Sequence, residues 1–493
     1  MDVPEAAGGR GRNPGAKHAR RLLPASDPAQ KTIASRPGGR VEDGPRARRV
    51  LLASPNPSLN PLMSSTSRLP SRARPPRLLP RRSFVQSLSA APVLLGLRSL
   101  ASEPAAAKGQ PKSFGPRGQT FSAAGEIKEL RDPETGARVV QLTGGDSDNV
   151  HLYFTSDSFL ADSNRVVFGS NRSGRYQFYL LETREQRLTQ LTEREGIRPT
   201  LACLSRHGRL NYFDGSELRV LHLDTLEDRE VYRVPGGYAP RLATCTDDGG
   251  FVAFAYGEKT EVSTQTGAIY STMAETYYQH PASVIMRINT KNGQALAVWG
   301  ERMWISHVVI HPFEPDTIVF CHEGGGLVKQ RMWVVNAAVR RARQAVPLFP
   351  MRPGEFTVHE YFTRTGDVGF QYEVERNGRM EYYNAFIRPD GTWIRQYLLP
   401  GPRPGHIQSN SDNTLVVGDR GFLSYEDKTG TNYVSLMTHG NGVARVRRLC
   451  RHQPGPTQYS HGHPVFSPDD RWVIYNSRLG PREHIAMADV TSL

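Results

Sequence analysis

Residues 166–181 read Val-Val-Phe-Gly-Ser-Asn-Arg-Ser-Gly-Arg-Tyr-Gln-Phe-Tyr-Leu-Leu. The pattern of this stretch recurs along most of the chain. Two apolar runs, 166–170 and 176–181, flank a polar turn that ends in Gly174. β-Branched and aromatic residues on both sides of a glycine-containing turn are typical of a β-hairpin. The stretch therefore predicts two neighbouring antiparallel strands.

The same pattern of two short apolar runs recurs along the rest of the chain, mostly at intervals of about 40–50 residues. The later pairs of runs are 210–213 with 218–223, 251–256 with 283–288, 317–320 with 331–335, 368–372 with 382–387, 414–418 with 432–436, and 472–476 with 484–489. Units of this length, each with several short strands, predict an all-β fold, a seven-bladed β-propeller. A β-sandwich is the structural alternative, but it would not explain seven similar units.

Two segments outside this pattern have expected roles of their own. Residues 125–144 precede the first unit, and we expect them to supply a strand that closes the ring against the last blade. Helical periodicity is scarce; the best candidate is 335–343, which could also form a long turn.

The formal net charge of +14 is concentrated at the N-terminal end. Residues 1–118 contain 21 Lys and Arg but only 6 Asp and Glu, whereas the remaining 375 residues contain 41 and 42. A basic segment rich in Pro, Ala and Ser, with few aromatic residues, is typical of a disordered leader. We therefore expect a leader over 1–118 and a propeller domain over 119–493. A basic tail that binds nucleic acid is the alternative, and we expect no nucleic-acid partner.

The leader contains a sequence that resembles a twin-arginine export signal near residues 81–107. Arg81 and Arg82 are followed by Phe84, by a weakly apolar run over 90–97 and by small residues at 105–107. Because 80 residues precede this motif, Met63 is a plausible true start. The pattern predicts a periplasmic or exported protein, cytoplasmic if the leader does not function. No apolar run approaches about 18 residues, so we expect no stable membrane association after export.

Candidate site residues lie just before the predicted units. His359 precedes the fifth pair of runs, His406 the sixth, and Gln458, His461 and His463 the seventh. In a propeller these positions surround the mouth of the central channel, so residues far apart in sequence can form one site there. His461 and His463 are spaced i, i+2, which would direct both imidazoles to one face of a strand. Imidazoles that face one point suit a divalent metal.

Several segments of the chain resemble oligogalacturonate lyases of pectate lyase family twenty-two, which are seven-bladed propellers. These segments are 189–196, 221–235, 321–324 with 330–333, 359–362, 405–419 and 458–470. The resemblance implies β-elimination of short α-1,4-linked galacturonate oligomers from pectin breakdown, with release of unsaturated uronates. It also implies a manganese ion, with His406, Gln458, His461 and His463 as ligands. His359 would be the general base, and Arg331 would neutralise charge.

Other interpretations of the protein's function remain. A non-catalytic carbohydrate- or protein-binding propeller would need no metal. A peptidase of the prolyl-oligopeptidase type is disfavoured because the chain has no G-x-S-x-G nucleophile motif. A glycoside hydrolase would need two carboxylates across the bond, and Glu323 and Glu360 are better explained as structural. An imidazole-rich ligand set would also suit zinc, copper or nickel. The sequence does not predict the oligomeric state.

Overall fold

The computed structural model describes residues 116–262, 272–339, 344–401, 403–419, 432–453 and 461–492, all within the compact unit Leu97–Leu493. Nearly all of the leader expected over 1–118 lies outside these ranges, so its disorder, its export signal and the domain boundary stay predictions. The described part is almost entirely β-sheet, with one short α-helix, α1 (Met273–Tyr278), which confirms an all-β fold. None of its helices is long and apolar enough to cross a membrane.

Three four-stranded sheets follow one another along the chain, each an antiparallel meander in sequence order. Their strands are β8 (Cys203–Leu204), β9 (Arg209–Asp214), β10 (Glu217–His222) and β11 (Asp228–Arg233); β12 (Tyr238–Cys245), β13 (Phe251–Glu258), β14 (Ala282–Asn289) and β15 (Ala295–Arg302); and β16 (Ile305–Ile310), β17 (Thr317–His322), β18 (Met332–Asn336) and β19 (Ala345–Pro347).

The next sheet has eight strands and consists of two antiparallel meanders of four. The first contains β20 (Glu355–Phe362), β21 (Val368–Arg376), β22 (Arg379–Ile387) and β23 (Arg395–Leu398), and the second contains β24 (Ile407–Ser409), β25 (Leu415–Gly418), β26 (Asn432–Gly440) and β27 (Val443–His452). A single parallel pair, Leu398 with Val443, joins them.

Strands from the two ends of the described chain share one five-stranded sheet. It contains β28 (Val465–Phe466), β29 (Trp472–Leu479), β30 (Arg482–Asp489), β3 (Arg138–Gln141) and β2 (Lys128–Arg131). The other five-stranded sheet contains β4 (Asn149–His151), β5 (Arg165–Ser170), β6 (Gln177–Glu182), β7 (Arg187–Gln190) and β1 (Thr120–Ser122). Because β3 pairs antiparallel with β30, the closing strand expected from residues 125–144 is confirmed.

Each of the seven pairs of apolar runs seen in the sequence forms two antiparallel neighbours. The pairs are β5 with β6, β9 with β10, β13 with β14, β17 with β18, β21 with β22, β25 with β26, and β29 with β30. The helix considered over 335–343 is wrong in its described part, since Asn336 ends β18 and a turn follows.

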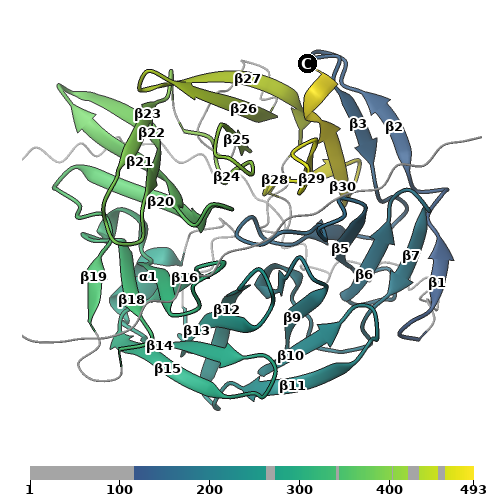
Figure 1. The fold of residues 1–493 in the computed structure, drawn as a ribbon, viewed down its shortest axis with the longest axis horizontal. Coiled ribbons are helices and arrows are strands. Elements are labelled where there is room, and N and C mark those ends of the chain that lie inside the picture. Colours follow the sequence, from purple (N-terminus) through teal and green to yellow (C-terminus); the bar gives the residue numbers. More distant parts are fainter. Residues whose placement is uncertain are drawn as a thin grey trace, which may run out of the picture. The chain divides into compact units, whose positions relative to one another are not determined.

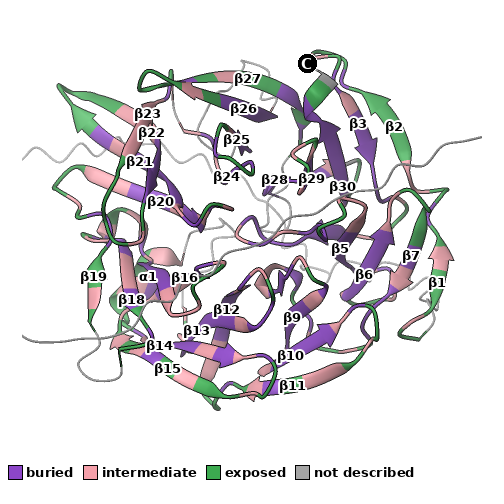
Figure 2. Ribbon diagram, in the orientation of Figure 1, coloured by how far each residue is buried: buried purple, intermediate pink, exposed green. Residues whose placement is uncertain are grey.

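Figure 1 shows the sheets arranged around a centre, with the first strand of each meander innermost. Contacts between these strands follow the same order: β8 meets β12, β12 meets β16, β16 meets β20, and β24 meets β28. β4 meets β29, the neighbour of β28. The innermost strand β4 is fully buried, whereas the outermost strand β2 is exposed (Figure 2). Residues that precede or interrupt the innermost strands therefore meet near one centre.

The closing role of β3 predicts that substitutions beside it destabilise the fold more than substitutions on the exposed strand β2. Leu142 directly follows β3, is 2% exposed, belongs to the central apolar cluster and donates its backbone N–H to Ile485 O at 2.8 Å. Leu142→Ala should lower the free energy of unfolding by about 2–5 kcal/mol because it leaves a cavity at the closing sheet. Leu130→Ala, on the exposed face of β2, should cost less than about 0.5 kcal/mol. Urea unfolding followed by tryptophan fluorescence measures both; equal losses would contradict this role for the closing strand.

Candidate metal centre and active site

His461 and His463 are not in a strand, contrary to the sequence expectation. Both precede β28, and His463 has a left-handed backbone with φ of 47°. Such a conformation in a non-glycine residue costs about 1–3 kcal/mol, so surrounding contacts must hold it. The two rings still face the same region, with their centroids 5.8 Å apart. The turn in the backbone, rather than strand alternation, brings the two imidazoles together.

Gly462 is required by the close approach of the neighbouring sheet. A Cβ atom at this position would lie 2.8 Å from the Asp419 Cβ, closer than real Cβ atoms approach one another. Asp419 follows β25, and its carboxylate accepts a hydrogen bond from the His463 backbone N–H at 2.9 Å. Glycine therefore allows the segment between the two histidines to lie against Asp419.

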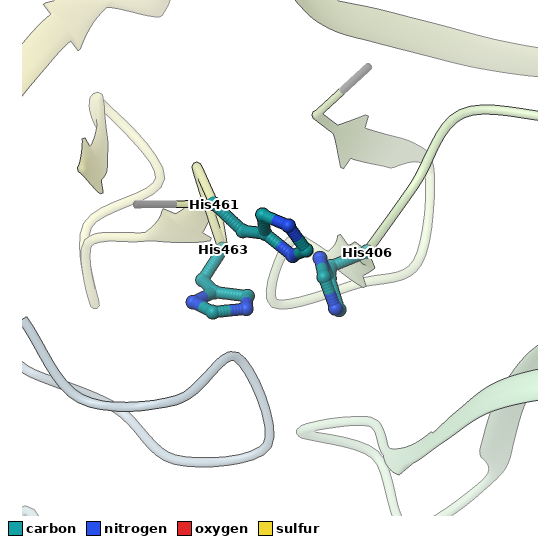
Figure 3. Close-up of side chains that lie close together, drawn as sticks. All are labelled: His406, His461 and His463. Atoms are coloured by element: carbon teal, nitrogen blue, oxygen red, sulfur yellow. The ribbon is translucent and has the colours of Figure 1, made fainter. Parts of the chain in front are cut away.

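His406 completes a group of three imidazoles. It precedes β24, and its ring centroid lies 4.2 Å from that of His463 and 5.4 Å from that of His461. One ring nitrogen from each residue lies within 4.8 Å of the other two, and all three residues are buried. Figure 3 shows the three rings approaching one another from two chain segments. The structure thus unites three of the four ligands expected from the sequence; Gln458 lies outside the described residues.

Asp419 orients His406 from behind. Its carboxylate accepts hydrogen bonds from the His406 backbone N–H at 2.7 Å and from His406 Nδ1 at 3.1 Å. Burial opposes ionisation of Asp419, but its charge interaction with His406 and this hydrogen bond lower its pKa overall. With Nδ1 donating to the carboxylate, Nε2 of His406 is the nitrogen available to a metal. A carboxylate behind a ligand histidine fixes the ring and raises its basicity.

The His461–His463 segment is also held by two residues that the sequence analysis did not single out. His151 of β4 has Nε2 3.1 Å from Gly462 O, and Asn476 of β29 donates to Gly462 O and to His461 O. The Asn476 side-chain oxygen accepts the His151 backbone N–H at 2.9 Å. Both residues are fully buried. They lock the backbone of the segment to two different sheets.

The donor set fits a divalent metal. Burial, with the neighbouring His406, lowers the pKa of His461 to about 4 and lowers that of His463 well below its ordinary value. Neutral imidazoles are the form that binds a metal, so these two need not release protons at neutral pH. Three imidazoles from two rigid segments, with an ionised carboxylate behind one of them, are suited to hold one ion.

His359 lies beside this group and is oriented as a base. It sits in β20 at a register shift between Val358 and Tyr361, has φ of 58°, and its ring centroid is 4.7 Å from that of His406. Its Nδ1 is 2.7 Å from Gln371 Oε1, while the Gln371 amide donates to Pro404 O at 3.0 Å. Nδ1 is therefore the protonated nitrogen, and Nε2 keeps its lone pair. Burial and the proximity of His406 lower the pKa of His359 well below its ordinary value.

Arg331 is buried and already paired with two carboxylates. Its guanidinium donates to Glu323 at 3.0 Å and to Glu360 at 3.3 Å. Burial would raise the pKa of both glutamates, but the charge of Arg331 lowers both overall. The positive charge of Arg331 is thus offset within the protein. Glu323 and Glu360 have the structural role expected from the sequence.

A second cluster with potential metal ligands is explained by this ion pair. His307, Cys321 and Glu360 have ligand atoms close together, but Glu360 is bound to Arg331 and lies 3.2 Å from His307 Nδ1. Burial raises the pKa of the Cys321 thiol well above its ordinary value. The arrangement favours an internal ion-pair network over a second metal site.

The family model described as oligogalacturonate lyase matches residues 126–492, about three quarters of the chain. The chain belongs to the oligogalacturonate lyase family. The matched region contains the three-imidazole group, His359 and Arg331, and the resemblance stated from the sequence is confirmed.

The chain is similar in sequence to two known members of the family over nearly their whole length. The oligogalacturonate lyase of Dickeya dadantii (strain 3937) is 29% identical over 382 residues, 73% of this chain and 95% of the relative. An oligogalacturonide lyase of Pectobacterium atrosepticum is 28% identical, with the same shares covered. A solved oligogalacturonate lyase in complex with manganese is 26% identical with a TM-score of 0.67, covering 76% of this chain and 98% of that one.

Two aromatic residues pack against the histidines of this site and were missed by sequence analysis. Tyr153 stands between the imidazole group and the Arg331 network: its ring is 4.7 Å from His463, and its hydroxyl is 3.3 Å from His307 Nε2. Phe154 is fully buried and packs against His406 and His359. Both lie after β4 and before the first pair of apolar runs, as His359 and His406 lie before the fifth and sixth pairs, so the same spacing argument could have singled them out.

The hydrogen bond behind His406 gives a direct test of the metal centre. Asp419→Asn should weaken manganese binding by about 10- to 100-fold because the ring loses its orienting carboxylate. Isothermal titration of the metal-free protein measures the change. Asp412→Asn, an exposed carboxylate that caps a turn in the same meander, is the matched control and should bind manganese as the parent does. Equal affinities in both variants would exclude the role given to Asp419.

Proposed function

We propose that this protein is an oligogalacturonate lyase that cleaves short α-1,4-linked galacturonate oligomers by β-elimination and releases unsaturated uronates. The observation that supports this most is the buried group of His406, His461 and His463 with the oriented base His359 beside it. This arrangement occurs in a chain whose family model and curated relatives are oligogalacturonate lyases. A non-catalytic binding propeller would have no use for this combination.

We also propose that the fold is a seven-bladed propeller. The eight-stranded sheet then counts as two blades, joined only by the parallel pair Leu398 with Val443, and each five-stranded sheet counts as one blade with an added outer strand. The seven confirmed strand pairs would form the second and third strands of the seven blades. The inner strands then begin at one face, which explains why His406 and the His461–His463 segment meet.

Manganese is the metal we propose for the three-imidazole group, with Gln458 as a fourth ligand from the sequence. The solved relative bound to manganese supports the choice. Because imidazoles intrinsically prefer later first-row metals, availability during folding would have to favour manganese. When bound, a divalent ion supplies Lewis-acid stabilisation of the uronate carboxylate as charge develops next to it.

His359 is the proposed base. Its Nε2 lone pair would accept the C5 proton of the galacturonate residue on the reducing-end side of the bond. The C5–H electrons form the C4–C5 double bond, the C4–O bond breaks, and the leaving oxygen takes up a proton from water. The lowered pKa of His359 keeps the ring neutral at pH 7, which is the form required of a base. Gln371 holds the ring so that Nδ1 cannot compete as the acceptor.

Arg331 has a modified role in this proposal. With Glu323 and Glu360 bound to it, the guanidinium adds little net positive charge. We therefore assign Arg331 to positioning and to N–H donation near the reacting carboxylate, and we expect the metal to contribute most of the charge stabilisation. Donors that are fixed before the reaction are effective because they need no reorganisation.

We propose export through the twin-arginine-like motif as the route to a periplasmic location. Oligogalacturonate remains the one expected partner.

The first test is the reaction itself. Full-length protein incubated with digalacturonate or trigalacturonate should produce the ultraviolet absorbance of a C4–C5 double bond. Chelation should abolish the rise, and added manganese should restore it, because the carboxylate otherwise makes C5 a poor acid. A folded, manganese-loaded protein that produces no absorbance would favour the binding-propeller alternative.

The second test isolates the base. His359→Gln should lower kcat by about 10²- to 10⁴-fold, because general-base assistance is lost while the side chain keeps a similar size. Manganese binding by the variant should remain, since His359 lies outside the three-imidazole group. His439→Gln is the control: this histidine stacks on Tyr397 with centroids 4.3 Å apart and should leave kcat unchanged. Loss of manganese binding in His359→Gln would instead indicate a ligand.

A further inference from the structure

Arg241 differs from the other arginines near the centre of the sheets. Arg331 is paired with Glu323 and Glu360, Arg364 with Asp157 and Asp470, and Arg206 with Asp157 and Asp247. Arg241 forms no ion pair with any residue in the described ranges, and its Nε is buried without a hydrogen-bond partner there. A buried N–H left without an acceptor costs stability, so retention of an arginine here calls for an explanation.

The backbone places Arg241 in the same structural position as the site residues of the next two inner strands. β12 has a register shift between Pro240 and Ala243, β16 has one between Ile305 and Val308, and β20 has one between Val358 and Tyr361. The residues in these irregularities are Arg241, His307 and His359. Bulges redirect side chains and are common beside active sites. Leu242, next to Arg241, packs in the same central cluster as Tyr153 and Phe154.

The guanidinium points toward the end of the sheet where the inner strands begin. Its Nη2 would be 3.4 Å from a Cβ placed on Gly257, which pairs with Ala239 near the start of β12. The same Cβ would be 3.3 Å from Ser283 Oγ, which accepts the Ile305 backbone N–H at the start of β16. The next residue, Ser306, donates to Glu323 of the Arg331 network at 2.7 Å. Arg241 therefore lies at the same end of the sheets as the start of β16, where Ser306 binds a carboxylate that holds Arg331.

No carboxylate among the residues that the structure describes forms an ion pair with Arg241. Burial, and then the charge of Arg198, lower the pKa of the Arg241 guanidinium. Arg198 directly precedes η1 (Pro199–Leu201), which contacts β12, and it is exposed without an ion pair in the described part of the chain. The guanidinium remains charged at neutral pH. Arg241 and Arg198 therefore pair with no carboxylate among the described residues, and they lie beside the proposed site for a polyanionic substrate. This arrangement suits an anionic ligand.

We propose that Arg241 binds a second carboxylate of the substrate, on a galacturonate residue other than the one that loses its proton. This inference rests on the proposed lyase function. Every residue of an oligogalacturonate carries a carboxylate, and a planar guanidinium binds carboxylates with two parallel N–H donors. Arg241 thus acts in substrate selection: it favours a charged neighbouring residue over an esterified one, and it does not touch the reacting atoms.

The test combines a variant with a modified substrate. Arg241→Gln should raise the KM for digalacturonate by about 10- to 100-fold with kcat within about threefold, because a charge-assisted contact to a remote group is lost. A digalacturonate methyl-esterified only on the residue that keeps its C5 proton should raise the KM of the parent by a similar factor. For Arg241→Gln, the KM for the esterified digalacturonate should be nearly the same as the KM for unmodified digalacturonate.

The controls separate this inference from the proposed function. Arg233→Gln, at the outer strand β11, removes a paired surface arginine and should leave KM unchanged for both substrates. Thermal unfolding of each variant verifies folding, and Arg241→Lys should restore part of the affinity through its charge if Gln does not fold. An equal ester effect in the parent and in Arg241→Gln would overturn the role of Arg241. A parent that forms no double bond from either substrate would overturn the lyase proposal itself.

Discussion

The carboxylate of Asp419 accepts hydrogen bonds from both chain segments that supply the imidazoles. It binds the backbone and the ring of His406 on one side and the backbone of His463 on the other. This interaction is possible only because position 462 has no Cβ. Without it, the left-handed conformation of His463 would lose one of the contacts that hold it, and the ring of His406 could rotate. The arrangement of the imidazoles therefore depends on one buried carboxylate that binds both segments.

The inner strands also direct polar side chains toward the centre through local irregularities. Arg241, His307 and His359 each occupy an irregularity in a strand that is otherwise regularly paired. Regular pairing on both sides supplies the stability that a bulge or a left-handed residue reduces locally. The repeated sheet thus provides rigid supports, and its interruptions direct polar side chains toward the centre. This is a physical reason for the site to be distributed over several sheets.

Charge is distributed unevenly within the site. Arg331 is offset by two glutamates, whereas burial lowers the pKa of His461 and His463 and so keeps both rings neutral, and Arg241 has no paired carboxylate among the described residues. A substrate with a carboxylate on each residue would find its countercharges at the metal and at Arg241. Under these two proposals, the group that responds to the reaction is different from the group that selects the substrate.

The sequence by itself determined the all-β class, the seven strand pairs, the closing strand and three neighbouring histidines. Local periodicity and turn residues carry that information, because strand pairing within a hairpin involves residues close in sequence. The tertiary structure decided that His461 and His463 converge through a left-handed turn, that Asp419 binds both segments that supply the imidazoles, and that Tyr153 packs beside His463. It also showed that Arg331 is already paired. These facts depend on contacts between sheets, where burial and approach distance are set by residues tens to hundreds of positions apart.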